Sequence, residues 1–274
     1  MSRPNLAAAL LLCLTAQPAI AGLPSCFPPV EIPRARIVRV ERNAVLVLED
    51  GRAAKLEGIV LPAGASDHAP DFLAEQAIAA LEDLATAHTM TLAAGIPKED
   101  RYGRLRAQAL LSEGTGERWL QRALLLQGLA RVSIAPDRSE CAGELYAAEQ
   151  IARSKRVGIW SEDAYRVRTP AQLDGEIGTF QIVEGTVRRV DSGGGRVFLE
   201  FGLDQHKDFA VVITADDLKN FRTIGVDPYS YQSRTVRARG WIAGGRRPEM
   251  EVATPADIEV TETPELRGSI AAPE

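Results

Sequence analysis

Apolar and polar residues alternate with a period of two near the start of the chain. Ala35–Val40 shows this alternation, and Ala44–Glu49 is a second run, rich in Val and Leu. Such runs are typical of strands that are at least partly buried. Asp50-Gly51 then supplies a favoured hairpin turn before a third run at Arg52–Val60. The pattern therefore predicts three strands joined as a meander.

The pattern then changes to the helical period. Apolar residues recur every three or four positions between Asp71 and Ala87, directly after Pro70, which favours a helix. The next expected elements are strands at 89–94 and 105–111 and helices at 117–127 and 140–156. A glycine follows each of the last two helices, as is common at helix C-termini. The predicted order is strand, strand, strand, helix, strand, strand, helix, helix.

A polar linker at 164–177 precedes a second series of short elements in residues 178–262. The expected elements there are strands at 178–190, 196–202 and 208–214, a helix at 215–224, and strands at 234–242 and 250–260. Strands interrupted by one helix in this order suggest a small OB-like β-barrel. The last residues, 263–274, have the composition of a disordered tail.

The first residues have the features of an export signal. Arg3 precedes an apolar run at Leu6–Leu14, and Ala19-Ile20-Ala21 fits a signal-peptidase site, so residues 1–21 are expected to be removed. A proline-rich arm at 22–34 would then begin the mature chain. We expect a periplasmic or secreted protein without a transmembrane segment, since no run is long enough to span a bilayer. The segment Leu23–Cys26 also resembles a lipoprotein cleavage box, and this alternative stays open.

Two of the three cysteines remain after removal of the signal. Cys13 lies inside it, which leaves Cys26 and Cys141. An even pair in an oxidising compartment favours a disulfide, which would join the N-terminal arm to the start of the last helix of the first domain. Two unrelated buried thiols are the alternative.

Length and charge restrict the possible functions. A chain of 274 residues is long enough for two domains, and its net charge of -5 gives no global attraction to nucleic acid. Binding of phosphates would therefore need a local patch of arginines. The oligomeric state is not indicated by the sequence.

One short motif combines a tight turn with aromatic and cationic side chains. Asp100–Arg104 reads D-R-Y-G-R, where Gly103 can adopt a positive φ and the turn aims Tyr102 and Arg104 into a concave site. With K-L-E-G-I-V-L-P-A at 55–63, the helical segment at 119–132 and C-A-G-E-L-Y to G-I-W at 141–160, the region 35–163 resembles the staphylococcal-nuclease-like (thermonuclease) family. The resemblance implies a five-stranded OB-type barrel with three helices.

The resemblance also implies a set of catalytic groups, most of which this sequence lacks. The family hydrolyses phosphodiesters with Ca²⁺ held by carboxylates, a glutamate that activates water, and two arginines. Here Asn43 and Val60 stand at the two metal carboxylates, Ala63 at the glutamate and Lys55 at the first arginine, while Arg104 is retained. We therefore expect no metal or other cofactor, with Arg104 and Lys55 as vestigial catalytic residues.

Two classes of function follow from this comparison. The leading hypothesis is a non-catalytic binding module whose partner is nucleic acid, an envelope protein or a glycan. Arg101, Tyr102 and Arg106 are the expected nucleic-acid contacts, extended by Arg36 and Arg39, although arginines at alternate strand positions are equally common as solvated residues.

The competing class is a divalent-metal-dependent endonuclease with a rearranged site. Glu41, Glu57 and Asp67 could rebuild a Ca²⁺ site, and the alternative for Glu57 is a surface ion pair with Lys55.

Other candidate sites are weaker. The three histidines, His68, His88 and His206, lack the companions of a zinc site. Asp191–Gly195 is glycine-rich, but no helix or lysine follows it as in a phosphate loop, so a hairpin turn is expected. The exposed aromatic platform expected in the second domain consists of Tyr229, Tyr231 and Trp241, whereas Phe180, Phe198, Phe201 and Phe209 are expected in its core.

Overall fold

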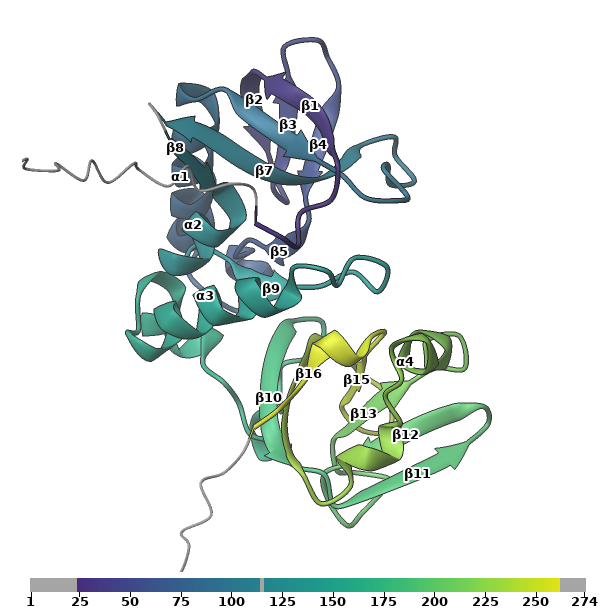
Figure 1. Cartoon of the computed structure of the whole chain (residues 1–274). Helices are drawn as coiled ribbons and strands as arrows, with labels where there is room; N and C mark the ends of the chain where they lie inside the picture. Colours follow the sequence, from purple (N-terminus) through teal and green to yellow (C-terminus); the bar gives the residue numbers. More distant parts are fainter. Residues whose placement is uncertain (1–23, 114–115, 262–274) are drawn as a thin grey trace, which may run out of the picture.

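The computed structural model describes residues 24–113 and 116–261, which form two β-rich units stacked one above the other (Figure 1). The expected signal peptide, with Cys13, and the expected tail at 263–274 lie outside these residues. Within the described residues, no helix has the length and apolar character needed to cross a membrane.

The first unit consists of a seven-stranded sheet, a separate pair of strands and three α-helices. Its strands are β1 (Val30–Ala35), β2 (Ile37–Glu41), β3 (Val45–Leu48), β4 (Ala53–Leu56), β5 (Gly58–Val60), β6 (Met90–Ala93), β7 (Leu105–Glu113), β8 (Gly116–Trp119) and β9 (Arg131–Ser133). The order is β1-β6-β7-β4-β3-β2, with β8 on β7 and a separate β5–β9 pair. The two ends of the order, β1 and β2, are separated in sequence only by Arg36. This arrangement is consistent with an OB-like α+β fold.

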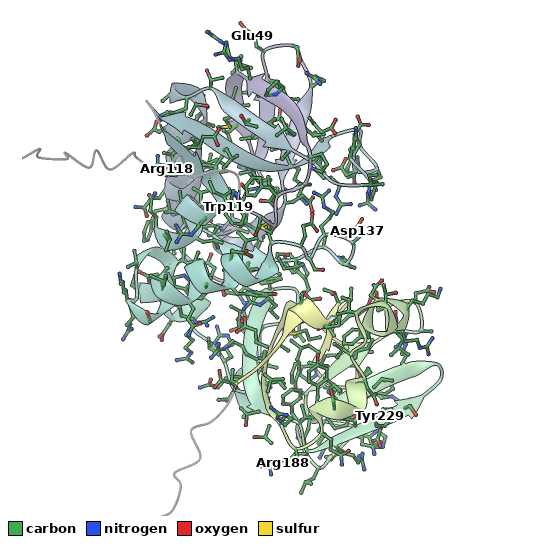
Figure 2. All side chains as sticks on the ribbon, viewed as in Figure 1. Glu49, Arg118, Trp119, Asp137, Arg188 and Tyr229 are labelled. Carbon is green, nitrogen blue, oxygen red and sulfur yellow. A yellow bond between two sulfur atoms is a disulfide. The ribbon has the colours of Figure 1, made fainter. Side chains whose placement is uncertain are left out.

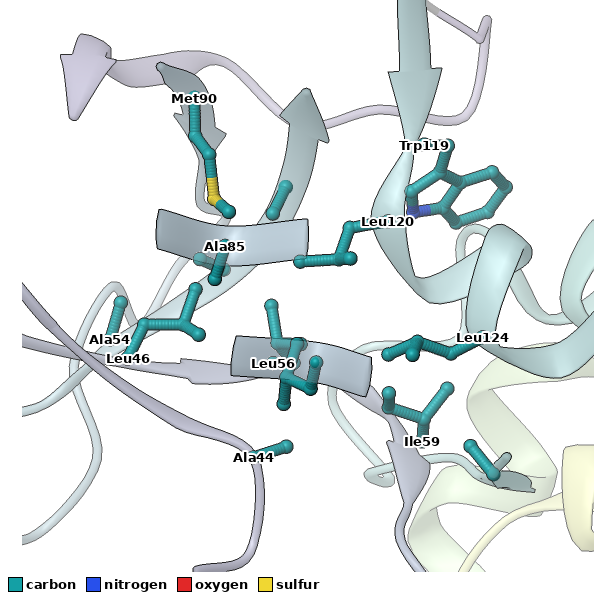
Figure 3. Packing of buried hydrophobic residues seen from close by; sticks show 14 of the residues in the cluster. Ala44, Leu46, Ala54, Leu56, Ile59, Ala85, Met90, Trp119, Leu120 and Leu124 are labelled. Atoms are coloured by element: carbon teal, nitrogen blue, oxygen red, sulfur yellow. The ribbon is translucent and has the colours of Figure 1, made fainter. Parts of the chain in front are cut away.

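Three helices cover this sheet, namely α1 (Asp71–Ala87), α2 (Leu120–Leu126) and α3 (Ala142–Ser154). The core lies between the sheet and these helices. Figure 3 shows Leu46 and Leu56 from the strands and Leu120 and Leu124 from α2 pointing into the same interior, and all four are fully buried. Burial of each such side chain contributes roughly 1.5–3 kcal/mol relative to its exposure.

Two expectations about this unit were wrong in detail. The strand expected at 52–60 is broken into β4 and β5 at Gly58, which has φ +84° and lies so close to α3 that a Cβ would approach Leu145 Cδ1 to 2.5 Å. Only glycine satisfies both constraints. The helix expected from 117 begins at Leu120, because Glu117–Trp119 pair with β7 instead. A tertiary sheet contact therefore overrides the local helical pattern.

The second unit is a mixed sheet with one short helix. It consists of β10 (Phe180–Thr186), β11 (Arg189–Gly193), β12 (Arg196–Glu200), β13 (Ala210–Ile213), α4 (Leu218–Ile224), β14 (Thr235–Ala243), β15 (Glu249–Glu251) and β16 (Ile258–Val260). The order is β10-β14-β15-β13-β12-β11, with β16 on β14 and a parallel β13–β15 pair. The single strand expected at 250–260 is thus two strands, β15 and β16, which pair with different parts of β14, and β15 also pairs with β13. Its hydrophobic core is separate from that of the first unit.

The aromatic residues of this unit are only partly where the sequence suggested. Phe180, Phe201 and Phe209 are buried, as expected. Tyr231 is buried as well, so it is not part of an exposed platform, whereas Tyr229 and Trp241 are about half exposed. Phe198 lies outside the core and packs beneath the guanidinium of Arg247. Tyr231 belongs to the core because the short 3-10 helix Pro228–Tyr231 turns it inward.

A disulfide joins Cys26 to Cys141, as predicted, across 115 residues of sequence. Cys141 directly precedes α3 and is buried in the core of the first unit. The bridge therefore fixes the N-terminal arm to the start of α3.

A buried polar contact connects the two units. Arg239 of β14 is 1% exposed, and its guanidinium donates to both carboxylate oxygens of Glu149 on α3, at 2.9 and 3.1 Å. It also pairs with Glu259 of β16 and lies over the ring of Tyr146. The Tyr146 hydroxyl donates to the carbonyl of Ala256. Burial alone would lower the pKa of Arg239, but these neighbouring carboxylates hold it above its ordinary value.

Apolar side chains complete the contact between the units. Ile182 of β10 packs in one cluster with Leu73 of α1 and with Trp160 and Tyr165, which follow α3. Arg131 of β9 donates to the carbonyl of Phe180 at 2.6 Å. Charged, polar and apolar contacts therefore all hold the second unit against α3 and β9.

We expect removal of the disulfide to destabilise the protein by about 4 kcal/mol, because the bridge closes a long loop in the unfolded chain. Urea unfolding with and without reductant measures this difference. The double variant Cys26→Ser with Cys141→Ser should unfold like the reduced protein and should not respond to reductant. Identical unfolding curves in both conditions would show that the bridge contributes nothing.

We expect Arg239→Ala to lower the free energy of unfolding by about 3–5 kcal/mol, because it leaves the Glu149 carboxylate buried without its main partner. Combining Arg239→Met with Glu149→Leu should recover part of this loss, since no buried charge then remains. Arg188→Ala, at an exposed position of the same unit, is the control. An Arg239→Ala variant as stable as this control would contradict the prediction.

Candidate functional site

The D-R-Y-G-R segment forms a compact turn between β6 and β7. The amide of Gly103 donates to the carbonyl of Asp100 at 2.9 Å, and Gly103 has the expected positive φ of 70°. The Asp100 carboxylate accepts from the amides of Tyr102 and Arg104 and from Arg104 Nε, the last at 2.7 Å. Burial raises the pKa of Asp100, but these hydrogen bonds more than offset it and keep the pKa below its usual range. The turn is therefore held by its own charged side chains.

Tyr102 stands at the tip of this turn with 66% of its surface exposed. The guanidinium groups of Arg101 and Arg104 lie 5.0 and 4.8 Å from the centre of its ring. Arg101 is exposed and has no ion-pair partner among the described residues. Arg104 is bound to Asp100, so its charge is already partly matched. The turn thus presents one aromatic ring and one free cation to solvent.

Arg106 does not belong to this exposed group. It is buried, and its guanidinium pairs with Glu57 at 3.1 Å and with Asp137 at 2.6 Å. Hydrogen bonds to Asp137 and Glu57 raise its pKa above the ordinary value of arginine, while those it donates to Asp137 lower the pKa of that carboxyl. The expectation that Arg106 contacts nucleic acid does not fit this position, because its charge is neutralised inside the protein.

Of the three positions that the resemblance associates with acids, two line one hollow of the first unit. Asn43 is in the β2–β3 turn with φ 61°, a conformation that asparagine tolerates well. Val60 ends β5, and Ala63 follows it by three residues. Asn43 and Ala63 line a hollow of about 670 Å³ together with Arg42, Asp71 and Glu75. The hollow therefore combines an amide and a methyl group where the family has carboxylates.

The carboxylates that could have rebuilt a metal site are not brought together. Glu57 pairs with Arg106, and Asp67 is buried against Arg131 at 2.7 Å and accepts from the Tyr165 hydroxyl. Glu41 pairs with Arg39 on the surface. In the part of the chain that the structure describes, no group of three or more His, Cys, Asp or Glu side chains is placed to hold a metal ion.

Lys55 lies on β4 beside Arg106, its register partner on β7. The expected ion pair between Lys55 and Glu57 is absent, because Glu57 is already bound by Arg106. Lys55 has no ion pair with any described residue. Arg39, which was expected to extend a basic face, is paired with Glu41, whereas Arg36 remains unpaired within the described chain.

The segment between β9 and α3 contacts β7 and the connection that carries the turn. Sequence patterns alone did not predict these contacts. Asp137, labelled in Figure 2, comes from this segment and completes the pair with Arg106. Arg138 is buried beside it, and its guanidinium lies against Gly95, where a Cβ would be 3.1 Å from Cζ. Arg138 Nη1 also donates to the carbonyl of Pro97 at 3.5 Å. The β9–α3 segment thus contacts the start of the β6–β7 connection through Arg138 and the start of β7 through Asp137.

Comparison with known families agrees with this geometry. Residues 55–162 match the family model described as staphylococcal nuclease homologue. The chain therefore contains a thermonuclease-like domain, and this domain relates it to a family of nucleases. No curated protein matches the sequence.

We expect Ca²⁺ to leave the melting temperature unchanged relative to a chelator, because Glu57, Asp67 and Glu41 are each bound to an arginine. Thermal unfolding followed by circular dichroism measures this. Glu75→Gln, which removes one of the acids lining the hollow beside Asn43, is the matched variant. A rise in melting temperature with Ca²⁺ that is lost in Glu75→Gln would contradict the expectation and locate an ion there.

Proposed function

We propose that this protein is an exported, non-catalytic binding module that uses a thermonuclease-like domain to bind nucleic acid. The observation that carries the proposal is the combination of a retained turn at Arg104 with Asn43, Val60 and Ala63 at the positions of the acids. We further propose that each unit is an OB-like arrangement of strands, although the sheet of the first unit has seven strands rather than the expected five.

The missing acids support the absence of hydrolysis. Loss of a single acid–base or electrostatic group commonly lowers an enzymatic rate by about 10²–10⁴. Here the water-activating carboxylate and both metal carboxylates are replaced together. Asn43 can offer only a neutral oxygen, and Val60 offers none, so a divalent ion would bind weakly. The Arg104 turn is present without the expected carboxylates, and this combination supports binding of nucleic acid rather than its cleavage.

The exposed turn supports nucleic acid as the partner. Bases stack on aromatic side chains without sequence preference, and each stacking contact contributes about 1–3 kcal/mol. Tyr102 is exposed for such a contact, and Arg101 and Lys55 supply unpaired cations in the same unit. Since the whole chain carries a net charge of -5, binding would depend on this local patch and would weaken with salt.

A second candidate is a divalent-metal-dependent endonuclease with a rearranged site. The match of residues 55–162 to the nuclease family favours it. In that case Ca²⁺ would be the cofactor, and Arg104 and Lys55 would stabilise the charge that develops on the phosphate. Arg104 would have to release part of its contact with Asp100 to do so.

One experiment with two readouts separates the candidates. Purified full-length mature chain is incubated with plasmid and with single-stranded DNA in Ca²⁺, Mg²⁺ or chelator. We expect no cleavage above the chelator background, and binding of the single strand that falls steeply as salt increases. Cleavage that needs the metal and is lost in Arg104→Ala would overturn the proposal in favour of the endonuclease.

Substitutions in the turn test the binding surface itself. Tyr102→Ala and Arg101→Gln should each weaken single-strand binding about tenfold, which corresponds to about 1.4 kcal/mol. Lys155→Gln, an equal charge change at an exposed site beyond α3, is the matched control and should bind like the wild type. If the wild type retains no labelled DNA at low salt, an envelope protein or a glycan replaces nucleic acid as the partner.

A further inference from the structure

A second hollow lies in the C-terminal unit, outside the matched thermonuclease-like region. It has a volume of about 480 Å³ and lies between the β11–β12 turn and α4, which Figure 1 shows close to each other. Its lining residues are Ser192, Gly193, Gly195, Arg196, Val197, Ala215, Leu218 and Arg222. The sequence motif S-G-G-G-R therefore forms one wall of the hollow.

The charged lining of this hollow has one sign. Arg196 and Arg222 are its charged residues, both are exposed, and neither has an ion-pair partner within the described chain. Acids in adjacent positions are already engaged: Asp191 pairs with Arg189 at 2.6 Å and Asp216 with Lys219 at 2.7 Å. Asp217 accepts from the Thr214 hydroxyl. Two arginines without an ion pair among the described residues thus line one hollow, and no acid lines it.

The turn leaves its backbone open on this side. Gly193 pairs with Arg196 across a two-residue hairpin turn, in which Gly194 and Gly195 have φ values of 59° and 78°. Consecutive positive φ values favour glycine, so this hairpin requires residues without a side chain. A Cβ on Gly195 would lie 3.6 Å from Ala215 Cβ, so the turn reaches the segment that leads into α4. A ligand in the hollow would meet main-chain groups as well as both arginines.

We propose that this hollow binds a phosphate-type oxyanion. Arginine presents a planar fork of N–H donors that matches the oxygens of phosphate. An anion bound near both arginines would also offset the repulsion between their positive charges. The Ser192 hydroxyl can donate a further hydrogen bond. The site lies in the second unit, so it stands whether or not the thermonuclease-like domain binds nucleic acid.

The phosphate group can belong to a free anion or to the backbone of a nucleic acid. Both sources present the same tetrahedral oxygens to the arginines. A free anion would occupy the hollow alone, whereas a strand would also contact residues outside it. Two arms of one experiment distinguish these sources.

The test follows the backbone amide signals of Gly193, Gly194 and Gly195 by NMR in the full-length mature chain with its disulfide intact. Sodium phosphate is added at constant ionic strength, with sodium chloride as the reference. We expect these signals to shift in a saturable way, with a dissociation constant on the order of 1 mM. The double variant Arg196→Gln with Arg222→Gln should lose the response, or weaken it at least tenfold.

Arg188→Gln is the matched control, because Arg188 is an exposed arginine of the same unit, is not among the lining residues and appears in Figure 2 at the far end of that unit. It should respond like the wild type. In the second arm, single-stranded oligothymidine replaces phosphate. If oligothymidine shifts the same glycine signals and added phosphate reverses these shifts, the site binds backbone phosphates. If phosphate shifts the signals and oligothymidine does not, the site binds a free anion.

Signals that stay fixed with both ligands, or that shift equally in the double variant, would overturn the proposal. DNA binding that persists in the double variant but is lost in Tyr102→Ala would leave the proposed function intact while excluding this hollow from it. The failure of one proposal is therefore distinguishable from the failure of the other.

Discussion

The arrangement of the two units depends on the ion pair between the buried carboxylate of Glu149 and the guanidinium of Arg239. The carboxylate is fully buried on α3, accepts from the amide of Val132 in β9 at 2.8 Å, and receives the guanidinium of Arg239 from the second unit. A buried charge is costly unless hydrogen bonds and an opposite charge surround it. This one group therefore requires β9, α3 and β14 to be in place together, and it ties the position of one β-rich unit to that of the other.

The same principle applies to the charged side chains of the first unit. Charge in the first unit is matched internally: Arg106 lies between Glu57 and Asp137, Arg131 contacts Asp67, and Arg104 is held by Asp100. An acid that is paired with an arginine binds a cation less well, because the neighbouring guanidinium repels the cation. The Asp100–Arg104 turn is closed by an ion pair of its own, and the carboxylates of Glu57 and Asp67 form ion pairs that stabilise the fold. Tyr102, at the tip of the turn, stays exposed to solvent.

Local features were well predicted from the sequence. The helix over 71–87 has the predicted bounds, the D-R-Y-G-R turn has its positive φ at Gly103, and the two cysteines of the mature chain are bonded. Each of these depends on nearby residues or on a simple count. The break at Gly58 and the pairing of 117–119 with β7 depend on distant strands and on α3, so periodicity could not reveal them.

Charge partners were the least predictable part of the site. Glu57 was expected beside Lys55, two residues away, but its partner is Arg106, which is 49 positions distant in sequence. Arg239 and Glu149 are separated by 90 positions. A charged residue has many possible partners, and only the fold selects one. The absence of the expected acids stays a prediction, because it depends on the alignment of the 55–63 motif through Leu56, Gly58, Ile59 and Pro62.

The position of the disulfide has a consequence for the exposed tip. Cys141 ends the same short segment that carries Asp137 and Arg138, and these two side chains underpin the connection that bears Tyr102. The disulfide and the connection that bears Tyr102 are thereby both attached to the segment between β9 and α3. Reduction of the bridge would remove a covalent restraint on Cys141 and therefore on the segment that contacts the β6–β7 connection, although no residue of the turn takes part in the bridge.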